Sequence, residues 1–249
     1  MVITDDFNKF SPRDYLKEIH SDNGTGEANK DILLSLIDEY KLVKPNSILL
    51  ELGGGPAIYQ LITAATKVKS IYFSEYIKGN LEEIKLWLKN DSSAWNWDGF
   101  INTTLSLEGS KDSLEKRKKL IRKKIVEILP GNVKEFNPVY NDKYLGFFDV
   151  IALNFVLDSI TNSLKDWEKY LDNCLNLLKP KGVLIYNAIA DIDTGWETGG
   201  IDFVGVEVRP NMLKEIFEKR SFKIKYLKKK SNSECRGHSA HLFCVAVRN

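Results

Sequence analysis

Short apolar runs alternate with segments of helical periodicity along most of the chain. Five of these runs have the length and composition of buried strands: 48–52, 69–75, 132–134, 147–154 and 183–187. Helical patterns separate them, and this alternation predicts a parallel, doubly wound sheet with right-handed crossovers. A helix over 212–220 then precedes two further strands, 222–227 and 241–247, and such a closing pair predicts an antiparallel edge strand. The predicted fold class is α/β, with one mostly parallel sheet of seven strands.

Two helical segments precede the first strand. Ser11 is a capping hydroxyl before a proline at the first helical position, so one helix is predicted from there to His20. The span from Ile32 to Tyr40 has the apolar spacing of a second helix. Neither has a sheet of its own, so we expect a lid over the ligand-binding edge of the sheet. One domain is predicted over 1–249, with a helical cap over 1–45 and a core over 46–249.

Three glycines, Gly53, Gly54 and Gly55, follow the first strand, and a helix is predicted to begin after Pro56. Without a Cβ, glycine lets a ligand lie against backbone N–H groups, and a helix start favours an electronegative group. The turn could serve a dinucleotide, a nucleoside cofactor such as S-adenosylmethionine, or only a tight bend. Glu75 follows Gly53 by 22 residues and ends the second strand. We favour an acid that binds ribose hydroxyls there over one that caps the next helix.

Tryptophans and lysines each gather in one segment. A loop predicted over 90–104 holds Trp95 and Trp97, and their rings, with that of Trp87, are interpreted as core rather than as a ligand-binding box. The segment 111–124 holds six lysines and two arginines, which would suit a phosphate-binding surface. Apolar residues at helical spacing favour a surface helix with a solvated basic face instead. These residues are Leu114, Ile121, Ile125 and Ile128.

Composition limits the classes of partner and the cellular location that we expect. The 249 residues are 43% hydrophobic and 28% charged, and the net charge of +2 gives no field that favours nucleic acid or an anionic membrane. We therefore expect no nucleic-acid or membrane partner, and a monomer or a weak homo-oligomer. Three widely spread cysteines and an N-terminus without a signal-peptide plan predict a cytoplasmic location.

Further candidate chemistry lies in the second half of the chain. A loop predicted over 191–202 follows the fifth strand, and the carboxyl ends of parallel strands carry ligand contacts. Its candidates for substrate contact are Asp191, Asp193, Trp196, Glu197 and Asp202. Four zinc-ligating residue types also occur close together, at Cys235, His238, His241 and Cys244. Their even three-residue steps run through a predicted strand and turn, so we predict no metal site.

Specific motifs resemble those of one family. They are Phe10-Ser11-Pro12-Arg13-Asp14-Tyr15-Leu16, Gly53-Gly54-Gly55-Pro56-Ala57-Ile58-Tyr59-Gln60-Leu61, Leu107-Glu108-Gly109 and the turn Leu177-Leu178-Lys179-Pro180-Lys181-Gly182. With them the chain resembles the class I S-adenosylmethionine-dependent methyltransferases. More narrowly, it is similar to the nicotinamide, phenylethanolamine and indolethylamine N-methyltransferases. The resemblance implies a Rossmann-like fold with an N-terminal helical lid, S-adenosyl-L-methionine as cofactor and a small-molecule methyl acceptor.

The resemblance also implies a set of cofactor-binding residues. They are Tyr15 and His20 in the lid; Gly53, Gly54, Gly55, Tyr59 and Gln60 around the methionine part; Glu75, Tyr76 and Asn80 at the ribose; Asn132 and Val133 at the adenine; and Asn154 and Phe155 at the sulfonium. Asn132 stands where the family has Asp, and its amide oxygen still accepts from the adenine amino group. His20 stands where a second lid tyrosine is usual; it is either structural or a contact to the donor's carboxylate.

The acceptor end departs from the family's pattern. Its aromatic-x-x-Gly-Glu segment reads Trp196-Glu197-Thr198-Gly199-Gly200, so the acid after the glycine is missing. The candidate substrate-binding residues are Tyr15, Asp191, Trp196, Glu197 and His238, and all but Trp196 are also candidate catalytic residues. Asp191, Glu197 or His238 would deprotonate or orient an ammonium substrate.

The predicted function is transfer of a methyl group to a nitrogen of an amine or heteroaromatic compound, by in-line displacement under a lid. Transfer to oxygen, sulfur or carbon of a small intermediate is one alternative, and a non-catalytic cofactor-binding member is another. An RNA methyltransferase comes third, because it would need a basic face beside the donor site.

Overall fold

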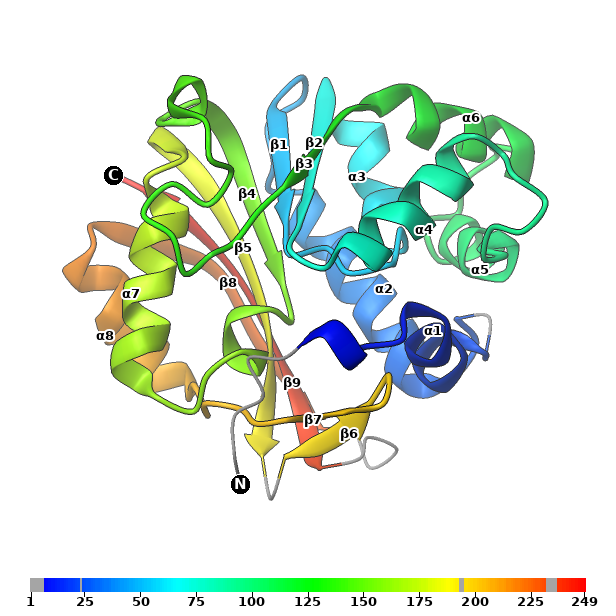
Figure 1. Ribbon diagram of the computed structural model, residues 1–249. Helices are drawn as coiled ribbons and strands as arrows, with labels where there is room; N and C mark the ends of the chain where they lie inside the picture. The colour runs from blue at the N-terminus through cyan, green and yellow to red at the C-terminus, as the bar shows by residue number, and fades with distance from the viewer. Residues whose placement is uncertain (1–6, 23, 193–194, 232–236) are drawn as a thin grey trace.

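One sheet of seven strands, in the order β3-β2-β1-β4-β5-β9-β8, forms the centre of the molecule (Figure 1). The structure is a computed structural model that describes residues 7–22, 24–192, 195–231 and 237–249. The strands of this sheet are β1 (Ile48–Leu52), β2 (Ser70–Glu75), β3 (Ile125–Pro130), β4 (Phe148–Asn154), β5 (Leu178–Ile192), β8 (Phe222–Ser231) and β9 (His238–Arg248). Neighbours from β3 to β5 are parallel, whereas β9 is antiparallel to both β5 and β8. The predicted fold class is confirmed.

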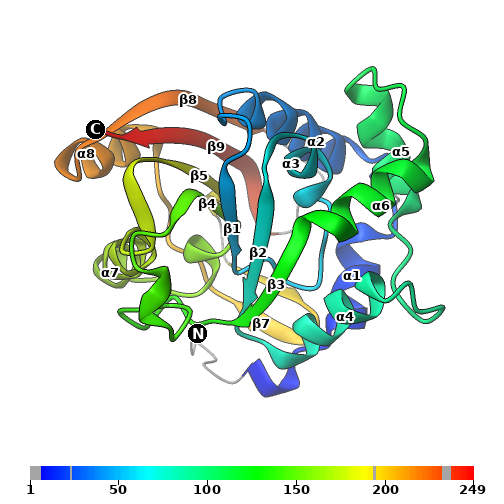
Figure 2. The same ribbon diagram turned by 90° about the horizontal axis from the view of Figure 1, so that it is seen from above.

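Helices cover both faces of the sheet (Figure 2). The larger helices are α1 (Pro12–His20), α2 (Glu27–Tyr40), α3 (Leu61–Lys67), α4 (Lys78–Leu88), α5 (Asp98–Leu107), α6 (Leu114–Lys124), α7 (Leu164–Leu175) and α8 (Pro210–Lys219), and single 3₁₀ turns lie at η1 (Phe7–Lys9), η2 (Asp142–Tyr144) and η3 (Leu157–Ser159). Helices α7 and α8 bury Trp167 and Phe217 against one face, and α2 to α6 pack on the other. Strand side chains alternate between these two cores, as the period of a strand requires.

The predicted antiparallel edge strand is present, because the outermost strand β8 pairs antiparallel with β9. Strand β9 sits between β5 and β8, and residues 240–246 are buried along its length. The edge strand is β8, which carries lysines at 223, 225 and 228–230. Lysines on an edge strand discourage pairing with another chain, because pairing would bury their charges. The apolar run of β9 therefore marks an interior strand.

The third strand was placed wrongly at 132–134, and it runs over 125–130 instead. Helix α6 ends at Lys124, and Ile125 already has an extended backbone, so Ile125 and Ile128 belong to β3 and do not continue the helix. Pro130 and Gly131 end the strand. Asn132 then lies in a turn, where its side-chain oxygen accepts from the backbone N–H of Lys134 at 3.0 Å.

Two more boundaries differ from the prediction. Helix α3 begins at Leu61, not directly after Pro56, because residues 56–60 form an irregular turn. The Gln60 side-chain amide holds that turn by donating to the backbone oxygens of Gly54 and Ala57, at 2.9 and 3.1 Å. The predicted loop over 191–202 is in part a hairpin, with strands β6 (Trp196–Thr198) and β7 (Ile201–Phe203).

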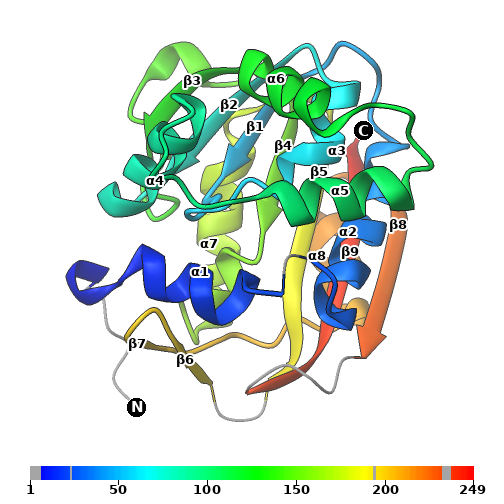
Figure 3. The same ribbon diagram turned by 90° about the vertical axis from the view of Figure 1, so that its right-hand side faces the viewer.

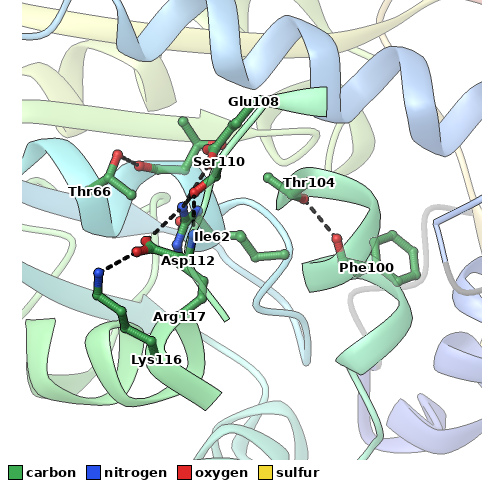
Figure 4. A network of polar contacts seen from close by, with 10 residues as sticks. Ile62, Thr66, Phe100, Thr104, Glu108, Ser110, Asp112, Lys116 and Arg117 are labelled. Atoms are coloured by element: carbon green, nitrogen blue, oxygen red, sulfur yellow. Dashed lines mark hydrogen bonds and ion pairs between the residues drawn. The ribbon is translucent and has the colours of Figure 1, made fainter. Parts of the chain in front are cut away.

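Part of the loop predicted over 90–104 is helix α5, and a buried arginine joins it to its neighbours (Figure 4). Arg117 of α6 is 1% exposed and donates to the Glu108 carboxylate at 2.8 Å and to the Ile62 carbonyl of α3 at 3.2 Å. Glu108 also accepts from Thr63 at 2.7 Å. The tryptophans of this region are core residues as predicted: Trp87 and Trp97 are buried, and Trp95 packs against the core partly buried.

Helix α1 lies across the carboxyl edge of the sheet, between α4 and the β6–β7 hairpin (Figure 3). The predicted cap is present: Ser11 Oγ accepts from the Asp14 N–H at 3.3 Å. Arg13 pairs with Glu83 of α4 at 2.7 Å, and Glu18 accepts from the Thr198 hydroxyl of the hairpin at 2.8 Å. Helix α2, which we expected in the lid, packs instead against α3, α5 and β9.

Within the four described ranges, no helix is long and apolar enough to cross a bilayer.

Candidate active site

A cavity of about 400 Å³ opens where strands β1 to β4 end, a volume within the range of small-molecule sites. Leu52, Glu75, Gly131 and Asn154 line it at or just beyond the ends of these four strands. Its other wall comes from the N-terminal segment and the hairpin, through Phe7, Phe10, Tyr15 and Phe203. The cavity thus joins the sheet edge to elements far away in sequence.

The glycine turn lies directly against its neighbours. Gly53 has a φ of +76°, and a Cβ there would stand 2.4 Å from Val156 Cγ2. Gly54 has an ordinary φ, but a Cβ on it would stand 2.4 Å from Phe73 Cε2. Both positions therefore require glycine, one for its conformation and its space and the other for space alone. This tight packing brings backbone to the cavity wall.

Glu75 joins the glycine turn to the start of α4, and a role at the ribose stays a prediction. Its Oε2 accepts from the Gly55 N–H at 2.9 Å, and its Oε1 accepts from the N–H of Ile77, the residue that precedes α4, at 2.8 Å. Burial raises the pKa of this carboxyl, and the backbone donors oppose that rise. Each carboxylate oxygen can accept more than one hydrogen bond, so a pair of ligand hydroxyls can still bind.

Two buried amide oxygens at the cavity lack a partner. Neither Gln60 Oε1 nor Asn80 Oδ1 has a hydrogen bond within the residues that the structure describes, and both side chains line the cavity. Buried polar atoms are costly without a partner, so these two fit a ligand that brings donors of its own. With Glu75 and the glycine turn, they suit a nucleoside with an amino-acid tail.

The predicted cofactor-binding residues come together, with one exception. The cavity is lined by Tyr15, Gly53, Gly54, Gly55, Tyr59, Gln60, Glu75, Tyr76, Asn80, Asn132, Val133, Asn154 and Phe155. His20 does not line it; the ring lies behind, 5.6 Å from Tyr15 and 5.1 Å from Tyr59 between centroids. Burial lowers the pKa of His20 to about 3, so the ring is neutral. A contact from His20 to the donor stays a prediction.

Of the acceptor-side candidates, Tyr15 lines the cavity and the other four lie outside it. Asp191 pairs with Lys229 at 2.6 Å beside a separate surface hollow. Glu197 is exposed on β6, and His238 lies against His241, with 3.2 Å between their Nε2 atoms. Trp196 stacks on Phe203, at 5.7 Å and 5° between ring planes, and so supports a cavity ring from behind.

Two predicted residues cannot be placed. Asp193, the remaining acid of the segment before the hairpin, and Cys235, one of the four metal-ligating types considered, lie outside the described residues.

The sequence analysis missed the aromatic residues on the side of the cavity that faces away from the sheet, which we call the roof. Phe7, Phe10 and Phe203 line the cavity together with Val156 and Ile160, and none was singled out. Phe10 stood in the N-terminal motif, which is the one signal that pointed to it. A buried acid was missed as well: Asp158 precedes the cavity residue Ser159, and burial raises its pKa to about 7.

Comparisons with known proteins place this chain in a family. The model of the NNMT/PNMT/TEMT family matches residues 1–248. The chain belongs to that family. Among relatives, human nicotinamide N-methyltransferase is 29% identical over 182 residues, which cover 71% of this chain and 68% of that protein. Phenylethanolamine N-methyltransferase of Macaca mulatta is 22% identical over 232 residues, which cover 87% and 81%. As the family predicts, the chain is an S-adenosylmethionine-dependent methyltransferase.

Solved structures of low sequence identity share the fold. The N-methyltransferase NodS from Bradyrhizobium japonicum, in complex with S-adenosylhomocysteine, has a TM-score of 0.57 and 12% identity, and the match covers 95% of each chain. A methyltransferase from Methanosarcina mazei has a TM-score of 0.58 and 12% identity, with 84% of this chain and 95% of that one covered. The Rossmann-like methyltransferase fold of this family member is therefore confirmed.

Proposed function

We propose that the enzyme methylates a nitrogen of an uncharged, flat acceptor such as a heteroaromatic base. The observation that carries this proposal is the ring-lined wall of the cavity, formed by Phe7, Phe10, Tyr15, Phe155 and Phe203. Such a wall favours a flat apolar molecule through stacking and burial.

Charge supports the same choice. Within the described lining, Glu75 and Lys134 are the charged residues, and both oxygens of Glu75 already accept from backbone N–H groups. With Glu75 taken by the ribose hydroxyls of the donor, a cationic ammonium acceptor would find no other carboxylate on that part of the wall, and burying its charge would be costly. A weakly basic ring nitrogen carries no charge at neutral pH and keeps the lone pair that attacks.

The protein's part in the reaction is positioning. S-adenosylmethionine, when bound, supplies a methyl group on a sulfonium. Glu75, Asn80 and the glycine turn would hold the nucleoside and the amino-acid tail, and the aromatic wall would hold the acceptor. Alignment of two bound reactants can supply much of the acceleration. Helix α1, which Glu18 and Arg13 tie to the hairpin and to α4, would keep water away from the bound reactants.

A panel of acceptors tests the proposal. The purified enzyme is incubated with S-adenosylmethionine and matched pyridines, quinolines, aliphatic amines, phenols and thiols, and methylated products are identified by mass spectrometry. We expect the heteroaromatic bases to give the highest kcat/KM. Activity confined to phenols or thiols would overturn the proposal. Binding of S-adenosylhomocysteine without any methylated product would favour a non-catalytic member.

An aliphatic amine is the second candidate, and Asp158 favours it. The carboxyl is fully buried beside the cavity wall; its Oδ2 accepts from the Ile189 N–H at 3.0 Å, and its Oδ1 has no partner among the described residues. Its pKa of about 7 suits a proton acceptor at neutral pH. If amines are the better substrates, Asp158→Asn should lower their kcat/KM at least about tenfold and leave heteroaromatic acceptors unaffected.

A further inference from the structure

The β6–β7 hairpin, which supplies Phe203 to the roof of the cavity, stands apart from the main sheet. It forms a two-stranded sheet of its own, and each of its strands has three residues. A two-stranded hairpin is at best marginally stable in water, so contacts with other elements must fix its position. At its base, the Val206 N–H donates to the Asp158 carbonyl at 3.1 Å, and the Trp196 ring lies 5.9 Å from that of His238. The turn between its strands forms its tip.

Helix α1 and the residue that caps it hold the tip of the hairpin. One oxygen of Glu18, Oε2, accepts from the Thr198 hydroxyl at 2.8 Å and from the Gly199 N–H at 3.1 Å. The Gly199 carbonyl in turn accepts from the Ser11 N–H at 2.8 Å. Thr198 and Gly199 are both buried, and buried donors are costly without an acceptor. Glu18 therefore stabilises this position of the tip.

The tip also supports a ring of the roof. Gly199 has a φ of +60°, and a Cβ there would stand 2.5 Å from Phe10 Cε2, so the Phe10 ring lies directly against this glycine. Between centroids, this ring is 6.4 Å from Phe203 and 5.6 Å from Tyr15. Phe10, Phe203 and Tyr15 all line the cavity. The hydrogen bonds of Glu18 therefore bear on the place where the N-terminal segment and the hairpin bring their rings together.

A separate set of contacts fixes helix α1 itself. Arg13 pairs with Glu83 of α4 at 2.7 Å and also donates to the Ser93 carbonyl. Leu16, on the same helix, is 0% exposed in the core. Glu18 takes no part in these contacts. Removal of its carboxylate should therefore loosen the hairpin and leave the helix in place.

We propose that Glu18 is a positioning residue for the methyl acceptor. It does not line the cavity; it acts through the tip of the hairpin, which holds Phe10 against Phe203 as a preformed surface for the acceptor to stack on. The role needs an accepting oxygen rather than a negative charge, because both hydrogen bonds end on Oε2. The inference rests on the proposed acceptor site but not on the chemical class of the acceptor.

Steady-state kinetics of two variants test the inference, with the acceptor that gives the highest kcat/KM in the panel. We expect Glu18→Ala to raise the KM of that acceptor about fivefold, or ~1 kcal/mol, and to keep the affinity for S-adenosylhomocysteine within about twofold. Glu18→Gln should restore the native KM, because its amide oxygen can accept both hydrogen bonds. An unchanged acceptor KM in Glu18→Ala, or an equal loss of donor affinity, would overturn the proposal.

Two neighbouring glycines of the tip give a matched pair of variants. Gly199→Ala and Gly200→Ala both place alanine at a positive φ, of +60° and +80°, so both strain the backbone. Only the first presses on Phe10, since a Cβ on Gly200 would meet only the Lys9 carbonyl oxygen, at 3.8 Å, within the part of the chain that the structure describes. We expect Gly199→Ala to raise the acceptor KM and Gly200→Ala to keep it. Equal changes of KM in the two variants would refute the assignment.

Hydrogen exchange, followed by mass spectrometry, tests the link to the hairpin without any acceptor. Peptides that cover residues 196–203 should exchange faster in Glu18→Ala than in the native enzyme, whereas peptides of α4 and β1 should not change. If the panel yields no methylated product, the proposed function fails, and this measurement alone decides whether Glu18 holds the hairpin. Native exchange rates in Glu18→Ala would overturn the proposal in either case.

Discussion

Gly54→Ala should damage the donor site through packing alone. The new methyl group would lie 2.4 Å from Phe73 Cε2, about 1 Å closer than the shortest ordinary contact of 3.4 Å. Phe73 is 0% exposed in the core of β2 and cannot turn away, so the glycine turn must move toward the cavity. Overpacking of this kind costs about 1–3 kcal/mol of stability. A wall displaced by about 1 Å should also weaken donor binding by at least about tenfold, or ~1.4 kcal/mol.

Urea unfolding and calorimetry with S-adenosylhomocysteine measure the two effects. Gly146→Ala is the control, because Gly146 has a φ of +59° but nothing within 4 Å of its added Cβ, and it does not line the cavity. It should lose about 1 kcal/mol of stability from backbone strain and keep its affinity. Native affinity and stability in Gly54→Ala would refute the reasoning, since they would show that Phe73 yields and the turn does not.

Three further predictions concern the lid, a surface acid and a buried acid of β1. Tyr15→Ala should slow turnover by a larger factor than the factor by which Glu197→Gln weakens donor binding, because Tyr15 lines the cavity and Glu197 is exposed. Single-turnover rates measure the first effect, and calorimetry measures the second. Asp191→Asn should leave kcat/KM within about twofold, because its carboxylate pairs with Lys229 outside the cavity. For Glu51, burial raises the folded pKa to about 8 from the ordinary value of 4.5, so its contribution to stability is full below pH 4.5 and is lost as pH rises to 8. Urea unfolding of Glu51→Gln across this range should therefore show a shallower fall, by up to about 1.4 kcal/mol per pH unit.

The donor end could be predicted from the sequence because its signals are local. The strand, the three glycines and Glu75 lie within one βαβ unit, so their spacing alone placed an acid beside the turn. The parallel sheet followed in the same way from strand and helix periods. Errors arose where two periods fitted the same residues, as at Ile125 and Ile128, which suit a helix and a strand equally well.

The acceptor end could not be predicted because distant segments assemble it. Phe10 and Phe203 meet at 6.4 Å between ring centroids, although they are far apart in sequence. A search for acids in one predicted loop therefore found Asp191 and Glu197, which lie outside the cavity, and passed over the rings. The burial of two carboxyl groups could not be predicted either, because nothing in the sequence around Glu39 or Glu51 indicates that these side chains are enclosed.

The donor-binding and acceptor-binding halves of the cavity should tolerate substitutions differently. The donor half is fixed by a turn in which Gly53 and Gly54 leave no room for a methyl group, so it tolerates little variation. The proposed acceptor half takes its rings from η1, α1, β7 and the chain between η1 and α1, and Glu18 of α1 accepts from Thr198 of β6, the strand paired with β7. On this proposal, we expect substitutions of Phe10 or Phe203 to alter the choice of acceptor without changing Glu75 or the glycine turn. Membership of the family therefore identifies the methyl donor directly, whereas the methyl acceptor has to be inferred from the aromatic residues that line the cavity.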